Sequence, residues 1–165
     1  MEYLVWFEAT SFSTWMRESG PAFFSSLILH SVAMGFAVGL HVAADLRILG
    51  IAPRVPLSLM RQFSSVLWVS LFAILVSGVL LLAAYPAKAL TNPVFYLKLA
   101  AVAAALLITR SLVHTLLQNA SHDIGSVPAK AKVLAASSLF LWVVAITAGR
   151  FLAYTHEVML AWHVY

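Results

Sequence analysis

The stretch PAFFSSLILHSVAMGFAVGLHVAA, residues 21–44, decides the fold of this chain. It contains no Asp, Glu, Lys or Arg, and its only ionisable side chains are two histidines, His30 and His41. A helix needs about 20 predominantly apolar residues to cross the roughly 30 Å hydrocarbon core of a bilayer. The stretch therefore predicts a membrane-spanning helix that carries two imidazoles.

The two histidines are predicted to share one face of this helix. A separation of eleven residues corresponds to about three turns plus about 20°, and to about 16 Å along the helix axis. An ionisable side chain inside a membrane helix is costly and rare, and it marks a functional site with a specific partner.

Three further apolar segments are long enough to span, at about residues 63–84, 95–117 and 133–156. The whole chain is 62% hydrophobic and 10% charged, which is typical of a membrane protein rather than a soluble domain. The connections are short and contain Gly and Pro, and short connections favour antiparallel neighbours. The sequence predicts an all-α integral membrane protein, residues 1–165 as a single membrane domain, with a four-transmembrane-helix up-down bundle.

The two ends of the chain and its loops predict how it sits in the membrane. Residues 1–20 alternate aromatic and polar side chains, so we expect an N-terminal interfacial amphipathic helix in contact with lipid. Lys and Arg are more frequent in the first and third loops than in the second, which places both termini outside a bacterial inner membrane. No basic cluster is present, so a nucleic-acid partner is not expected.

Histidines in the later spans point to heme. The third segment contains His114 and the fourth contains His156, while the absence of cysteine excludes thiolate metal sites and covalently attached heme. Four histidines on three helices are the pattern expected for two hemes b with imidazole ligands. The predicted depths match well for His41 with His114, whereas those of His30 and His156 differ by about 8 Å. One heme therefore stays an alternative to two.

Arginines and glycines complete the predicted heme site. Arg110 and Arg150 are predicted to bind heme propionates, because a guanidinium inside a span needs an anion. Snorkelling to lipid headgroups is the alternative, above all for Arg150. Gly35 and Gly39 are predicted to make room for a porphyrin beside the histidines, and plain small-residue helix packing is the alternative.

These features favour a membrane-embedded b-type cytochrome subunit that transfers electrons between the quinone pool and a partner redox protein. A quinone is expected near a heme edge, and the partner is a redox subunit or a soluble cytochrome. No nucleophile–base pair or phosphate loop is visible, so the chain is not expected to be an enzyme alone but an electron-transfer subunit of an oxidoreductase complex. Two alternatives stay open: a structural or assembly subunit of a larger membrane complex, and a copper or other metal transport protein.

Several short motifs carry a resemblance to a known group of proteins. They are His30-x4-Gly35, Asp45-Leu46-Arg47-Ile48-Leu49-Gly50, Asn92-Pro93-x-Phe95-x2-Lys98, His114 and Gly149-Arg150. On these motifs the chain resembles a family of uncharacterised bacterial four-helix membrane proteins, over nearly its whole length. The family often carries an aliphatic residue at the position of His41, so His41 departs from the pattern. More loosely, the layout is similar to small di-heme b-type cytochromes and to membrane anchor subunits of respiratory dehydrogenases, a likeness that does not by itself carry function.

Overall fold

The structure is a computed structural model that describes residues 2–52, 54, 63–119 and 127–162, with the backbone alone at residues 2, 113–119, 153 and 155–162. The described residues form helices and no strands. The helices are α1 (Glu2–Glu8), α2 (Ser11–Glu18), α3 (Gly20–Leu49), α5 (Ser64–Ala84), α6 (Pro86–Leu90), α7 (Pro93–Asn119) and α8 (Ala129–Trp162).

Four of these helices, α3, α5, α7 and α8, are long and apolar enough to span a membrane. The predicted all-α fold with four membrane-spanning helices is therefore confirmed. Three of the four helices, α3, α7 and α8, run further than the predicted spans. In α3 the extension carries the helix past Asp45 and Arg47, because nothing in the sequence stops it before a glycine is reached.

Both ends of α3 are set by local sequence. At the start, the Ser19 side chain accepts a hydrogen bond from the Ala22 amide, and Pro21 fits the first turn, where an amide hydrogen is not needed. At the other end, Gly50 adopts a φ of +83°. The Ile51 amide donates to the Leu46 carbonyl over 3.0 Å, a helix-terminating arrangement that favours glycine at the left-handed position.

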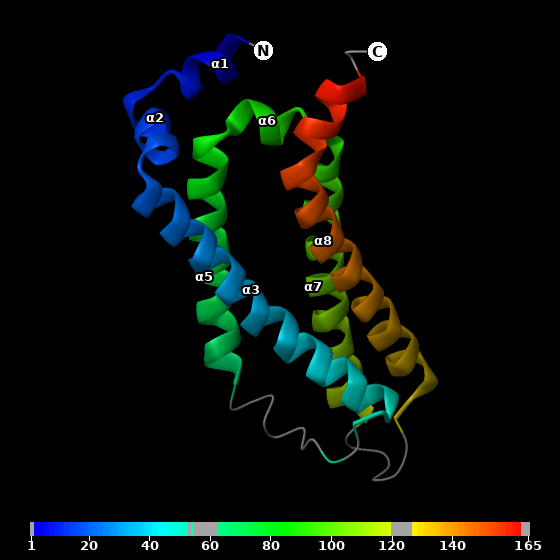
Figure 1. Cartoon of the computed structure of the whole chain (residues 1–165). Coiled ribbons are helices and arrows are strands. Elements are labelled where there is room, and N and C mark those ends of the chain that lie inside the picture. The colour runs from blue at the N-terminus through cyan, green and yellow to red at the C-terminus, as the bar shows by residue number, and fades with distance from the viewer. Residues whose placement is uncertain (1, 53, 55–62, 120–126, 163–165) are drawn as a thin grey trace.

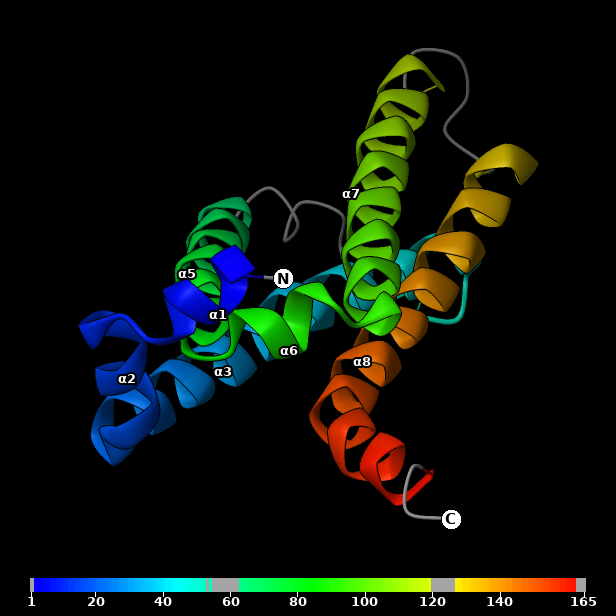
Figure 2. The same ribbon diagram turned by 90° about the horizontal axis from the view of Figure 1, so that it is seen from above.

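The four long helices form two hairpins that α3 joins by a diagonal crossing. The extensive contacts among them are α3 with α5, α7 with α8, and α3 with α8. Figure 1 shows α3 running from the α2 end of α5 across to the far end of α7 and α8. Seen from above in Figure 2, α5 stands apart from α7, and the short helix α6 connects them.

The predicted neighbour relations hold only in part. Consecutive spans pack together in the pairs α3–α5 and α7–α8, but α5 and α7 do not pack extensively among the described residues. Helix α6 and the turn before it form the connection between α5 and α7, which stand apart (Figure 2).

One stripe of α3 supplies the packing to both hairpins. Its buried residues are Ser26, His30, Ala33, Ala37, Val38, His41, Ala44, Asp45 and Ile48, which recur mostly every three or four positions. This spacing is one face of a helix. The prediction that the two histidines share a face is therefore confirmed, and because α3 is inclined, the first half of the stripe meets α5 and the second half meets α8.

Two apolar clusters fix the register of α3 against α7 and α8. In the first cluster Val38 packs with Ala101 and Ala105 of α7 and with Trp142 and Ala145 of α8. In the second cluster Ile48 packs with Leu112 of α7 and with Ala131 and Ala135 of α8. Small alanine side chains on α7 and α8 let the helices approach closely, as is common in membrane helix pairs.

The N-terminal helices α1 and α2 lie at the same end of the molecule as α6 (Figure 1). The Arg17 guanidinium donates to the carbonyl of Ala84 at the end of α5 (3.0 Å) and to the carbonyl of Glu8 (2.8 Å). The Glu8 carboxylate accepts from the Ala87 amide in the first turn of α6 (3.1 Å). A cation at a helix C-terminus and a carboxylate at a helix N-terminus each complement the helix dipole, so this segment ties the ends of α5 and α6 together.

Candidate functional site

His30 is held by the neighbouring helix α5 through one defined nitrogen. Its Nδ1 lies 3.0 Å from the Ser77 hydroxyl oxygen, and both side chains are buried. The Ser77 hydroxyl donates its own hydrogen to the Ala73 carbonyl, so it accepts from His30. Nδ1 of His30 therefore carries the proton, and Nε2 keeps a lone pair.

A glycine on α5 makes room for the His30 ring. A Cβ added at Gly78 would lie 3.4 Å from Cε1 and 3.8 Å from Nδ1 of His30, whereas Nε2 is not among the atoms within 4 Å. The Nδ1–Cε1 edge of the ring thus faces α5. Nε2 is the ring nitrogen farther from Gly78, and the Ile74 carbonyl of α5 is a further hydrogen-bond partner of the ring.

Lys98 is the cation on the opposite hairpin. Its side chain lies along Gly149 of α8, where an added Cβ would be 3.6 Å from Cε and 3.7 Å from Nζ. Its charge acts electrostatically on His30, which brings one group from each hairpin into the same region. The glycine on α8 accommodates the lysine as Gly78 accommodates the histidine.

Lys98 has no carboxylate partner among the described side chains. Asp45, the acid in the described part of the spans, lies beside Ser138 on α8. Ser138 precedes Gly149 by eleven residues, which is about 16 Å along the helix. Within the described side chains the charge of Lys98 therefore has no carboxylate counter-charge.

His41 lies in a second region, between α3 and α8. Its Nδ1 is 2.7 Å from the Ala37 carbonyl, which can only accept, so Nδ1 carries the proton. Its Nε2 is buried and has no hydrogen-bond partner. The ring packs against Trp142 with ring centroids 4.9 Å apart and planes at 48°.

His41 and Trp142, together with the neighbouring pair Asp45 and Ser138, form what we call the α3–α8 polar cluster. The exposed fractions of these side chains are 5%, 3%, 4% and 0% respectively. The Ser138 hydroxyl lies beside the Asp45 carboxyl. Yet His41 Nε2, Asp45 Oδ2, Ser138 Oγ and Trp142 Nε1 all lack a hydrogen-bond partner within the structure. Buried polar atoms are normally satisfied, so this concentration needs an explanation.

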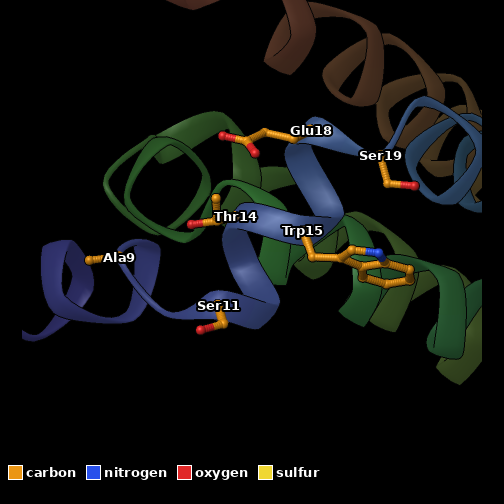
Figure 3. Close-up of a pocket in the computed structure, with 6 residues that line it drawn as sticks. All are labelled: Ala9, Ser11, Thr14, Trp15, Glu18 and Ser19. Atoms are coloured by element: carbon orange, nitrogen blue, oxygen red, sulfur yellow. The ribbon is translucent and has the colours of Figure 1, made fainter.

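A surface depression lies beside α2, and its lining contains none of the predicted site residues (Figure 3). Its lining residues are Ala9, Ser11, Thr14, Trp15, Glu18 and Ser19.

Comparison with protein families identifies the family of this chain, but that family has no known activity. Residues 3–155 match the model of a family of unknown function, DUF6644. The chain belongs to this family. No curated protein and no solved structure is similar enough to match. Family membership agrees with the resemblance to an uncharacterised group and does not extend to the cytochromes.

The structure separates the predicted site residues instead of gathering them. His30 faces α5 and His41 faces α8, so the two imidazoles have different surroundings. The side chains of His114 and His156 lie outside the described part of the chain, and so do the ligand pairings predicted for them. Within the described residues, no three His, Cys, Asp or Glu side chains form a metal-binding group.

The helix register differs from the depth match predicted for His41 with His114. Leu112 of α7 packs with Ile48, and Ile48 follows His41 by seven residues, which is about 10 Å along α3. The backbone position of His114 is beyond Leu112 and is therefore level with the end of α3. The reason for the difference is the inclination of α3, which changes the depth that each residue of this helix reaches.

The predicted arginines and glycines lie away from the two histidines. Arg110 and Arg150 are both exposed on the outer surface of the described structure. Gly35 and Gly39 are exposed as well, with nothing within 4 Å of an added Cβ. At about 100° per residue they lie roughly 120–180° around α3 from His30 and His41. The glycines that adjoin functional side chains are Gly78 and Gly149 instead.

The sequence contained a signal for two charged residues that were not included in the predicted site. Lys98 and Asp45 are charged residues inside or at the edge of a span, and such residues are functional candidates by default. Their positions near helix ends favoured snorkelling to the interface. Ser77, Ser138 and Trp142 carry no comparable sequence signal, because serine and tryptophan are common in membrane helices.

Proposed function

We propose that this protein is a membrane-embedded b-type cytochrome subunit that binds heme through His30. The observation that carries the proposal is the orientation of this imidazole: Nδ1 donates to Ser77, and the Nδ1–Cε1 edge of the ring faces Gly78. Nε2 is the nitrogen proposed to bind the iron. A histidine that ligates a metal usually donates its other ring nitrogen to a fixed acceptor, which orients the ring and strengthens the ligand.

Lys98 supports the same proposal from the other hairpin. A heme brings carboxylate groups into the membrane, and Lys98 is a cation that lacks a carboxylate partner among the described residues. Its positive charge acts on His30, and in the proposal one ligand contacts both groups. In this proposal Lys98, rather than Arg110 or Arg150, pairs with a propionate.

A second residue that would hold the heme is proposed on α8. His156 follows Gly149 by seven residues, about 10 Å along the helix, and it is the predicted partner of His30. Without it the heme iron has one protein ligand. His41 is a weaker candidate, because its ring already packs against the Trp142 indole.

Heme b supplies one-electron chemistry, and the protein residues set how it is held. The proposed role is to pass electrons between the quinone pool and a partner redox protein. The proposed location is a bacterial inner membrane with both termini outside, where α1, α2 and α6 face the partner. No described residue set identifies a quinone site.

The test is a dithionite-reduced minus oxidised absorption spectrum of the purified protein, with heme quantified as the pyridine hemochrome. We expect a b-type α-band, which His30→Ala abolishes and Lys98→Met weakens. His122→Ala is the matched histidine control and Lys88→Met the matched lysine control; both are expected to keep full heme content. A colourless, folded preparation from heme-sufficient cells would contradict the proposal and favour a structural subunit or a metal transport protein. Heme that survives His30→Ala but not His41→Ala would move the ligand to the second region.

A further inference from the structure

The α3–α8 polar cluster is distinct from the region of His30 and Lys98. Asp45 and Ser138 lie about 16 Å along α8 from the level of Lys98. The cluster has two residues from each helix, spaced four apart: His41 and Asp45 on α3, Ser138 and Trp142 on α8. Residues four apart lie on the same helix face, so the two pairs meet across the helix contact.

Three acceptor atoms of this cluster have no hydrogen-bond partner: an imidazole nitrogen, a carboxylate oxygen and a hydroxyl oxygen. The His41 ring packs against Trp142, and the Asp45 carboxyl lies beside Ser138. The Ala37 carbonyl fixes the proton of His41 on Nδ1, so the Nε2 atom presents a lone pair to the cluster. This orientation by a backbone carbonyl is the usual second contact of a histidine that ligates a metal.

The charge of the Asp45 carboxylate favours a cation over a water molecule as its missing partner. A water molecule can satisfy the hydrogen-bonding atoms, but it leaves the buried Asp45 carboxylate without a counter-charge. An uncompensated buried charge is strongly unfavourable. The two cluster residues on α8, Ser138 and Trp142, are neutral and supply no counter-charge.

The position in the fold favours a positive ion as well. Asp45 lies four residues before Leu49, the last residue of α3, and so one turn from a helix C-terminus. The carbonyl groups at a helix C-terminus carry partial negative charge and stabilise cations. An imidazole nitrogen together with oxygen donors suits first-row transition metals rather than alkali ions, which prefer oxygen alone.

We propose that the α3–α8 polar cluster binds a divalent first-row transition-metal ion through His41 Nε2, Asp45 Oδ2 and Ser138 Oγ. Three protein donors leave at least one coordination position open, a feature of exchangeable or reactive metal sites rather than closed structural ones. The Trp142 indole nitrogen is a donor and cannot bind the ion; it is placed to donate to a carboxylate oxygen or to a metal-bound water. The site does not depend on the heme proposed at His30.

The experiment is equilibrium dialysis of the full-length, chelator-stripped protein in nanodiscs against Zn²⁺ or Co²⁺, with the metal counted by mass spectrometry. We expect one ion per chain, and a ligand-field absorption spectrum with Co²⁺ that reports a nitrogen–oxygen donor set. His41→Ala and Asp45→Asn should each weaken binding at least tenfold, and Ser138→Ala should weaken it several-fold. Ser137→Ala, one residue away on the same helix, is the matched serine control and should bind as the unaltered protein does.

Two of the variants also serve as controls. Asp45→Asn preserves the shape of the side chain, so its helical circular dichroism and elution volume report whether the fold is intact. His30→Ala should retain metal binding even where it abolishes heme, which separates the failure of one proposal from that of the other. Absence of binding to the unaltered protein, or one ion per chain that survives both His41→Ala and Asp45→Asn, overturns the metal site and leaves water or a protonated carboxyl as the partner.

Discussion

Replacement of Ser77 by alanine tests how much the fold depends on the hydrogen bond that orients His30. The bond is 3.0 Å long, the serine is fully buried, and the imidazole is 9% exposed. Removal of the hydroxyl takes away the side-chain acceptor of His30, while the Ile74 carbonyl stays beside the ring. The free energy of unfolding should therefore fall by about 1 kcal/mol, the net value of one hydrogen bond. The Ala73 carbonyl loses little, because it also accepts the helical amide of residue 77.

The matched control is Ser70→Ala, which removes a buried hydroxyl two turns earlier on the same helix and does not contact His30. Unfolding in mixed detergent micelles, followed by circular dichroism as the denaturing detergent is increased, gives both free energies. We expect Ser77→Ala to be less stable than Ser70→Ala by about 1 kcal/mol. Equal stability of the two variants would show that Ser77 does not orient the imidazole, and it would remove the basis for the assigned tautomer.

Three other predictions concern stability and use the same unfolding assay. Arg17→Met should lower the free energy of unfolding by about 2 kcal/mol, since it removes charged hydrogen bonds to the Ala84 and Glu8 carbonyls. The control Glu18→Gln, on the exposed side of α2, should change it by no more than about 0.5 kcal/mol. Equal free energies for the two variants would refute the contact between α2 and α5. Gly50→Ala should cost about 1–2 kcal/mol because its φ of +83° is left-handed, and an unchanged stability would mean that α3 ends differently. Asp45→Asn should raise the free energy of unfolding by about 1–3 kcal/mol in the presence of chelator, because it removes an unpaired buried charge. In saturating Zn²⁺ the unaltered protein should instead be more stable than Asp45→Asn. A loss of stability in Asp45→Asn in chelator would contradict this reasoning.

The apolar runs of the sequence were sufficient to predict the class of fold. Each long run had to be a helix, because backbone polar groups in a membrane must be satisfied within the segment. The spacing of eleven residues between His30 and His41 was also sufficient to place them on one face, since helical periodicity is independent of tertiary structure. These predictions depend on local geometry alone, and they are confirmed.

Predictions that required relative depth or the choice of neighbours were less successful. Depth was counted as if each helix stood upright, but α3 is inclined, so the level of His41 against α7 is set by Ala101 and Ala105. The placement of Gly35 and Gly39 near the histidines neglected their own angular position on the same helix. Lys98 was missed because a lysine near a helix start normally snorkels, and only its contact with Gly149 reveals that it lies along a neighbouring helix.

The diagonal course of α3 has a consequence for biogenesis. The contact between His41 and Trp142 joins residues about a hundred positions apart, on the first and last spans to be synthesised. The hairpin of α3 and α5 can therefore enter the membrane and pack while half of the chain is still being made, with the polar atoms of His41 and Asp45 uncovered. These atoms are enclosed only when α8 packs against α3. A chain that is truncated or stalled before its last span would therefore expose a carboxylate and an imidazole to lipid. A membrane quality-control protease could distinguish such a chain from the finished protein by that exposed pair.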